Sequence, residues 1–144
     1  MATSVLLDDR LLIEELLVGL PRRRAERTAT TASWYYRACR AAVVGAAGHL
    51  SGPFAQLERR DQEAAVLSLL TLRDDIGLPD PRRTVPAMAR LAARHPRLNL
   101  LNLEAAGAAQ TMAADVWLSE EAAKGVLPSV LDAESIPWTT IERK

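Results

Sequence analysis

The chain has 144 residues, 49% hydrophobic and 25% charged, which is the composition of an ordinary globular protein and excludes a fibrous or wholly disordered one. Its 18 basic and 18 acidic residues cancel, so any contact with nucleic acid or an anionic membrane has to come from a local patch. A single cysteine, Cys39, excludes an internal disulfide framework, and no apolar run has the length of a membrane span, so we expect a cytoplasmic protein with one domain over residues 1–144.

The chain opens with a predicted strand and helix. An apolar run predicts a strand over residues 5–7, and leucines that recur at helical spacing predict a helix over 10–18. Residues 21–31 are polar and carry no periodic pattern. We therefore expect them to form a long connection without regular structure.

The middle of the chain is predicted to be mainly helical. A helix capped by Thr31 or Ser33 is expected to run to about residue 47. A second, amphipathic helix is predicted over 57–70. The segment 72–78 predicts a short edge strand before a proline-rich turn.

The last third of the chain alternates between helices and strands. Its patterns predict helices over 84–95 and 98–112, a strand over 116–118, a helical stretch over 120–131 and a last strand over 136–141. Few strands among many helices indicate an α/β fold with a small parallel sheet flanked by helices.

Acidic residues follow two of the predicted strands. Asp8 and Asp9 come after the first, and Glu120 and Glu121 come after the strand over 116–118. Ligands of open α/β sheets bind beyond the carboxyl ends of the strands, and clustered carboxylates are typical ligands of Mg²⁺ or Mn²⁺. These acids have a second interpretation as helix caps and first-turn residues, which the helix dipole also favours.

Basic and aromatic residues interleave between Pro21 and Arg40, where Glu26 is the lone acid. Cations bind phosphates and aromatic faces stack on bases, so this pattern is typical of single-stranded nucleic acid binding. Three consecutive aromatic residues cannot share one helix face, however, and at least one is expected in the core. The candidate RNA-binding residues are Arg10, Arg22, Arg23, Arg24, Arg37, Arg40, Trp34 and Tyr36.

Several segments resemble the PIN-domain proteins. The family opens with an apolar strand that ends in Asp, as does Leu-Leu-Asp at 6–8. It continues with an alanine-rich helix that begins with an acid, as at 103–109, and with a strand followed by acids, as at 114–121. The closing strand is matched by Ser-Ile-Pro-Trp-Thr-Thr-Ile at 135–141. The resemblance spans nearly the whole chain and implies a PIN-like α/β/α sandwich.

The resemblance also implies a function. PIN proteins are metal-dependent nucleases, commonly the toxin of a bacterial toxin-antitoxin pair, which implies an endoribonuclease with Mg²⁺ or Mn²⁺, an RNA substrate, an antitoxin-like protein partner and a homodimer. In this chain the catalytic acids would be Asp8, Glu104 (or Asn102 in another register) and Glu121, with Glu120 or Asp9 as a further metal ligand. The metal would orient water and stabilise the phosphate in the transition state, with Asp8 as its most central ligand.

The chain departs from the family in several ways, and one is that Glu104 and Glu121 stand where the family normally has aspartate. The family's second acid belongs near residues 33–42, but no Asp or Glu lies between Arg27 and Leu57. Arg10 stands where a small Asn or Ser usually supports the site, and its guanidinium would compete with a metal or bind a phosphate. Two functions are therefore consistent with the sequence: a PIN-like endoribonuclease of reduced activity, and a degenerate PIN-like module that serves as a protein-interaction or RNA-binding subunit.

Overall fold

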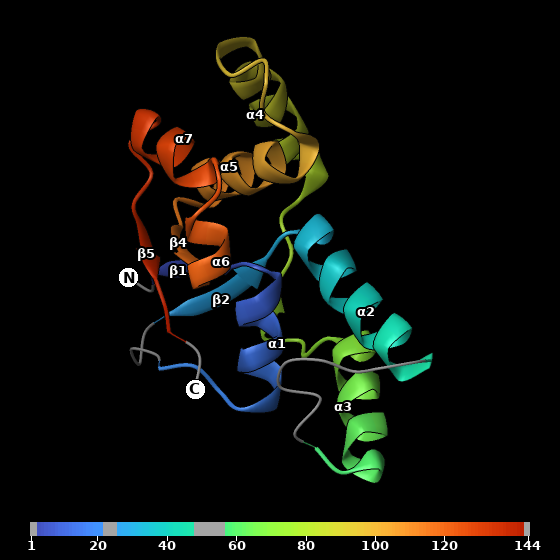
Figure 1. The fold of residues 1–144 in the computed structure, drawn as a ribbon. Helices are drawn as coiled ribbons and strands as arrows, with labels where there is room; N and C mark the ends of the chain where they lie inside the picture. The colour runs from blue at the N-terminus through green and yellow to red at the C-terminus, as the bar shows by residue number, and fades with distance from the viewer. Residues whose placement is uncertain (1–2, 22–25, 48–56, 143–144) are drawn as a thin grey trace.

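The computed structural model of the protein describes residues 3–21, 26–47 and 57–142. Five parallel strands form one sheet in the order β3-β2-β1-β4-β5, with α1 and α2 on one side and α5 and α7 on the other (Figure 1). This confirms the predicted α/β fold. The elements are β1 (Ser4–Leu7), α1 (Asp9–Leu17), β2 (Arg27–Thr30), α2 (Ala32–Ala47), α3 (Arg59–Thr71), β3 (Ile76–Gly77), α4 (Pro81–Arg94), α5 (Leu100–Met112), β4 (Asp115–Leu118), α6 (Glu120–Ala123), α7 (Leu127–Ala133) and β5 (Trp138–Thr140).

Strand β1 lies at the centre of the sheet. Leu6 is opposite Ala29 of β2 on one side and opposite Val116 of β4 on the other. Both faces of β1 are covered by helices, which explains why Val5, Leu6 and Leu7 form a continuous apolar run instead of an alternating one. Since β1 and β4 are parallel neighbours, their carboxyl ends meet at the same edge of the sheet.

Two main groups of buried side chains hold the layers together. On one side of the sheet, Leu6 and Val116 pack with the alanines of α5. These small side chains let α5 lie close to the sheet, and Gly107 lets α4 lie close to α5, since a Cβ there would be 3.0 Å from Cγ of Met88. On the other side, Leu12 of α1 packs with residues of α2 and α3.

Helices α2 and α3 are joined by a polar contact as well as by packing. The hydroxyl of Tyr35 on α2 lies 3.0 Å from the carbonyl oxygen of Leu69 and 2.9 Å from that of Leu70. These carbonyls belong to the last turn of α3, where backbone oxygens have no partner within the helix. The hydroxyl of Tyr35 therefore holds the C-terminal turn of α3 against α2 by hydrogen bonding.

The prediction of an unstructured connection over 21–31 is wrong, because β2 occupies Arg27–Thr30. Thr28 and Thr30 are buried, and the hydroxyl of Thr30 donates to the carbonyl oxygen of Leu7 at 2.8 Å. Threonine has a high strand propensity but counts as polar in a hydrophobicity pattern, so this buried strand was not recognised. Residues 22–25 of the same segment lie outside the described residues.

Two further boundaries differ from the prediction. The helix expected over 84–95 begins at Pro81, because the side chain of Asp80 caps it by accepting from the backbone N–H of Arg82. The helical stretch expected over 120–131 is two helices, α6 and α7, and Pro128 lies in the first turn of α7, where proline is tolerated. The short edge strand expected over 72–78 is present as β3. No helix in the described part of the chain is long and apolar enough to cross a membrane.

Glu134 joins three helices at one end of the molecule. Its carboxylate accepts from Arg94 Nη2 at 2.8 Å and Nε at 3.1 Å, and from Gln110 Nε2 at 3.2 Å. Nε2 of His95 lies 2.8 Å from the same carboxylate. The hydrogen bonds from Arg94, and then from His95, lower the pKa of Glu134 to about 2.

The low pKa of Glu134 predicts a loss of stability in acid. Above pH 4.5, its value when unpaired, the carboxylate contributes stability, and this contribution is lost as the pH falls from about 4.5 to about 2. We therefore expect the gap in unfolding free energy between wild type and Glu134→Gln to shrink over this range in urea titrations. The matched control is Glu63→Gln, at an exposed position. Its unfolding free energy should change with pH as that of wild type does. A difference in unfolding free energy between wild type and Glu134→Gln that stays constant from pH 4.5 to about 2 would contradict the lowered pKa of Glu134.

Candidate functional site

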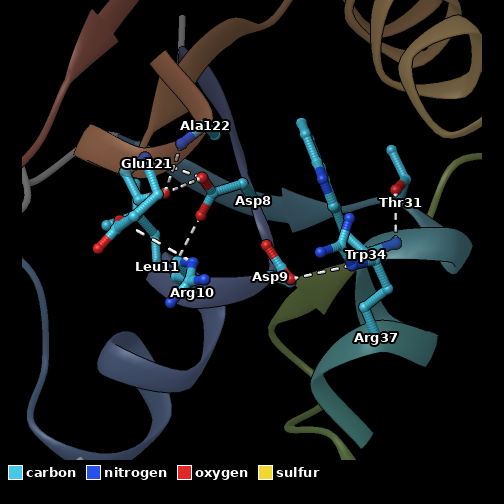
Figure 2. A network of polar contacts seen from close by, with 10 residues as sticks. Asp8, Asp9, Arg10, Leu11, Thr31, Trp34, Arg37, Glu121 and Ala122 are labelled. Carbon is cyan, nitrogen blue, oxygen red and sulfur yellow. Dashed lines mark hydrogen bonds and ion pairs between the residues drawn. The ribbon is translucent and has the colours of Figure 1, made fainter. Parts of the chain in front are cut away.

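Asp8 lies where the carboxyl end of β1 meets that of β4. It follows the last residue of β1, caps the N-terminus of α1 and has no exposed surface. Its Oδ1 accepts from the backbone N–H of Leu11 at 2.9 Å. Its Oδ2 accepts from both the backbone N–H and the hydroxyl of Ser119, at 2.8 and 2.6 Å (Figure 2). One buried carboxylate thus joins the β1–α1 turn to the β4–α6 turn.

Burial and hydrogen bonding act on Asp8 in opposite directions. Desolvation raises its pKa above 3.8, while the hydrogen bonds from Ser119 and Leu11 lower it by less. Both oxygens are occupied by donors of the protein itself. To bind a metal ion, the buried carboxylate of Asp8 would have to become accessible between the two turns that it joins.

The other predicted acids also have partners within the protein. Glu104 on α5 is half-buried, and its Oε1 accepts from the backbone N–H of Ser33 at 2.8 Å, at the start of α2. Glu120 and Glu121 form the first turn of α6 behind the cap residue Ser119, as in the second interpretation of the sequence. Glu120 is exposed, and Oε2 of Glu121 lies 3.9 Å from Nε of Arg10.

These positions do not form the metal site that the sequence suggested. Across residues 3–21, 26–47 and 57–142, no three Asp, Glu, His or Cys side chains are placed so that they could hold a metal ion together. Asp8 and the start of α6 do meet, as the strand rule predicts. However, Asp8 points into the protein, Glu104 contacts α2 and Glu121 points towards Arg10. The residues present therefore do not fit Mg²⁺ or Mn²⁺ in this arrangement.

A cleft of about 330 Å³ opens beside these residues, beyond the carboxyl ends of β1 and β4. Two arginines line it, each paired with a carboxylate that also lines it. Arg37 Nε lies 3.3 Å from Asp9 Oδ2, and Arg10 Nε lies 3.9 Å from Glu121 Oε2. Figure 2 shows the Arg10 pair on one side of Asp8 and the Arg37 pair on the other. The other lining residues are Trp34, Asn99, Leu101, Asn102, Ser119, Ala122, Gly125, Val126 and Leu127.

The predicted RNA-binding residues divide into several groups. Arg10 and Arg37 line the cleft. Trp34 also lines it but is only 3% exposed, because it packs in the core between the sheet and α5. Tyr36 and Arg40 are exposed on α2 outside the cleft. Arg22, Arg23 and Arg24 lie outside the described residues.

Sequence reasoning did not identify Asn99 as a cleft residue. It caps α5, since its side-chain oxygen accepts from the backbone N–H of Asn102 at 2.9 Å. An asparagine immediately before an alanine-rich helix is a recognisable cap signal, which would have placed it at the end of α5. The signal does not show that this helix end borders the cleft.

Comparison with known proteins supports the fold. The sequence matches no family model and no curated protein. Among solved structures, the chain is similar to one of VapBC-1 from nontypeable Haemophilus influenzae, with 16% sequence identity and a TM-score of 0.51. The alignment covers 96% of this chain and 98% of that one. The likeness is one of fold, and the parallel sheet between helices is consistent with the PIN-like α/β/α sandwich.

The contacts of Asp8 predict a large stability cost for its removal. Asp8→Ala leaves the N–H groups of Leu11 and Ser119 and the hydroxyl of Ser119 without their buried acceptor, so we expect a loss of about 3 kcal/mol or more in urea unfolding. In Ser119→Ala the other bonds of Asp8 remain, and the expected loss is about 1 kcal/mol. The double variant should lose less than the sum of the two. Additive losses would show that the two side chains do not interact.

The raised pKa of Asp8 predicts a pH effect opposite to that of Glu134. Because the folded protein holds the Asp8 proton more tightly than the unfolded chain does, wild type should lose stability relative to Asp8→Asn as the pH rises from 3.8 through the folded-state pKa. Urea unfolding of both proteins across this range measures the difference. An increase in the stability of wild type relative to Asp8→Asn as the pH rises would mean that the pKa of Asp8 is lowered instead.

Proposed function

We propose that the chain is a PIN-like module that binds RNA in the cleft beyond β1 and β4 without metal-dependent cleavage. The observation that carries the proposal is the position of Asp8. The carboxylate expected at the centre of a metal site is fully buried, and both its oxygens accept hydrogen bonds from the protein. The cleft beside it is lined by two arginines.

The charge of α2 supports binding to RNA. Tyr36, Arg37 and Arg40 are exposed on this helix, and no acidic residue occurs between Arg27 and Leu57. Arg37 and Arg40 are three residues apart and so are neighbours on the helix surface. The protein has no net charge, so a local basic surface of this kind is what would attract a polyanion. Tyr36 is 64% exposed and supplies an aromatic face for a base.

The second candidate is the metal-dependent endoribonuclease implied by the PIN resemblance, with Asp8, Glu104 and Glu121 around Mg²⁺ or Mn²⁺ and Glu120 as a further ligand. The fold likeness to a chain of VapBC-1 favours it, as does the proximity of Asp8 to the start of α6. It requires the buried carboxylate of Asp8 to become accessible to a metal ion, and Glu104, whose Oε1 accepts from Ser33, to reach the same ion.

A protein partner also belongs to the proposal. The PIN resemblance implies an antitoxin-like protein and a homodimer. Exposed apolar side chains on α2 and α3 provide surface for such contacts: Val43 is 50% exposed, Val44 63% and Leu67 62%.

The test is RNA binding and cleavage with and without metal. We expect a short single-stranded RNA to bind in EDTA, to bind more weakly as salt rises, and to remain intact with millimolar Mn²⁺. Arg37→Gln and Arg40→Gln should each weaken binding by about threefold to tenfold in fluorescence anisotropy. Arg82→Gln, an exposed arginine on α4, is the matched control.

Three results would change the conclusion. Cleavage that requires Mn²⁺ and is lost in Glu104→Gln and Glu121→Gln would establish the nuclease. RNA binding equally weakened by Arg82→Gln would show a diffuse electrostatic attraction instead of a site. No binding to RNA at all would overturn the proposal and leave the protein-interaction module.

A further inference from the structure

We propose that the cleft holds the phosphomonoester group of a nucleotide between Arg10 and Arg37, an inference that rests on the proposed function and specifies its ligand. The two guanidinium groups come from different helices, Arg10 from the first turn of α1 and Arg37 from α2. Figure 2 shows them on the two sides of the β1–α1 turn. Both arginines line the same cleft, and we place the phosphate between them there.

The present ion pairs leave both arginines able to contact a phosphate. The Nε atoms of Arg10 and Arg37 lie 3.9 and 3.3 Å from their carboxylates, and the arginine side chains are 48% and 53% exposed. Glu121 is 42% exposed, so its pair with Arg10 contributes about 0–1 kcal/mol, whereas Asp9 is 18% exposed and stays beside Arg37 when a phosphate binds. A guanidinium group carries five N–H donors in a planar fork, which matches the oxygens of phosphate better than a single long contact to a carboxylate does.

The number of terminal oxygens favours a monoester over a diester. The charged lining residues of the cleft are Arg10, Arg37, Asp9 and Glu121, and their charges sum to zero. The direct contacts of the ligand with the two guanidinium groups therefore have to select it. A phosphomonoester carries a charge of about −1.5 to −2 at neutral pH and has three terminal oxygens. A phosphodiester within an RNA strand carries one negative charge and two such oxygens.

The N-terminus of α5 adds to the attraction. Asn99, Leu101 and Asn102, at the start of this helix of 13 residues, line the same cleft. The positive end of the helix dipole and the side-chain amides at this end favour an anion. This helix end supplements the two arginines and would not form a site without them.

The size and the remaining walls of the cleft fit a single nucleotide. A volume of about 330 Å³ is at the lower end of the range for small-ligand sites, roughly 300–1,000 Å³, so the cleft admits one nucleotide unit and not a length of strand. The turn between α6 and α7 contributes Gly125, Val126 and Leu127, which offer apolar surface to a ribose or base. The terminal nucleotide of a phosphorylated RNA and a free mononucleotide present the same chemistry here.

The experiment compares three ligands in EDTA: a short RNA with a 5′-phosphate, the same RNA with a 5′-hydroxyl, and a nucleoside 5′-monophosphate. The RNAs carry their label at the 3′ end, and affinities are measured at fixed ionic strength. We expect the 5′-phosphate to raise RNA affinity about tenfold at pH 7.5, and this advantage to fall below pH 6 as the phosphate gains a proton. Arg10→Gln and Arg37→Gln should abolish the advantage, and Arg82→Gln should keep it.

The outcomes separate this inference from the proposed function. Equal affinity for the two RNAs, with Arg37→Gln still weakening both, would overturn the monoester site and leave RNA binding intact. Binding of the mononucleotide without either RNA would support the site and overturn the RNA-binding module. Binding of none of the three would overturn both. Since Arg10 and Arg37 are half-exposed, thermal unfolding of the variants should match wild type and exclude misfolding as the cause of a loss.

Discussion

The buried contact between Asp8 and Ser119 determines how the centre of the molecule is arranged. The two residues are 111 positions apart, yet one carboxylate oxygen accepts two hydrogen bonds from Ser119 while the other caps α1. The contact fixes the ends of β1 and β4 relative to each other, and with them the starts of α1 and α6. Arg10 and Glu121 lie in the first turns of those helices, so one wall of the cleft depends on the same contact.

Much of the fold could be predicted from local patterns, because burial on both faces of β1 requires a continuous apolar run and α5 requires small residues to lie close to the sheet. Strand β2 does not show in the hydrophobic pattern because two of its three buried positions are threonines, and the hydroxyl of Thr30 donates to the carbonyl oxygen of Leu7 on the neighbouring strand. The sequence could place Asp8, Glu120 and Glu121 after predicted strands, but it could not show which groups the candidate acids contact. Glu104 contacts the N-terminus of α2 and Asp8 contacts α6, and neither partner is visible in the surrounding sequence.

The cleft combines a position set by the strand order with paired charges of both signs. Its place beyond the carboxyl ends of β1 and β4 follows from the fold, and strand order alone would bring side chains together there. What they can bind depends on their identity and direction. Here the central acid points inwards, and the two arginines that reach the cleft are each paired with a carboxylate, so the lining offers guanidinium donors without a net charge.

The two edges of the sheet are short. Strand β3 at one edge has two residues, and β5 at the other has three. An edge strand can recruit a strand from another chain through its unpaired backbone groups, and the length of the edge limits how many such bonds can form. Edges this short leave little room for sheet extension or edge-to-edge aggregation. Stable association with another protein would therefore have to use helical surfaces, with side-chain packing in place of backbone hydrogen bonding.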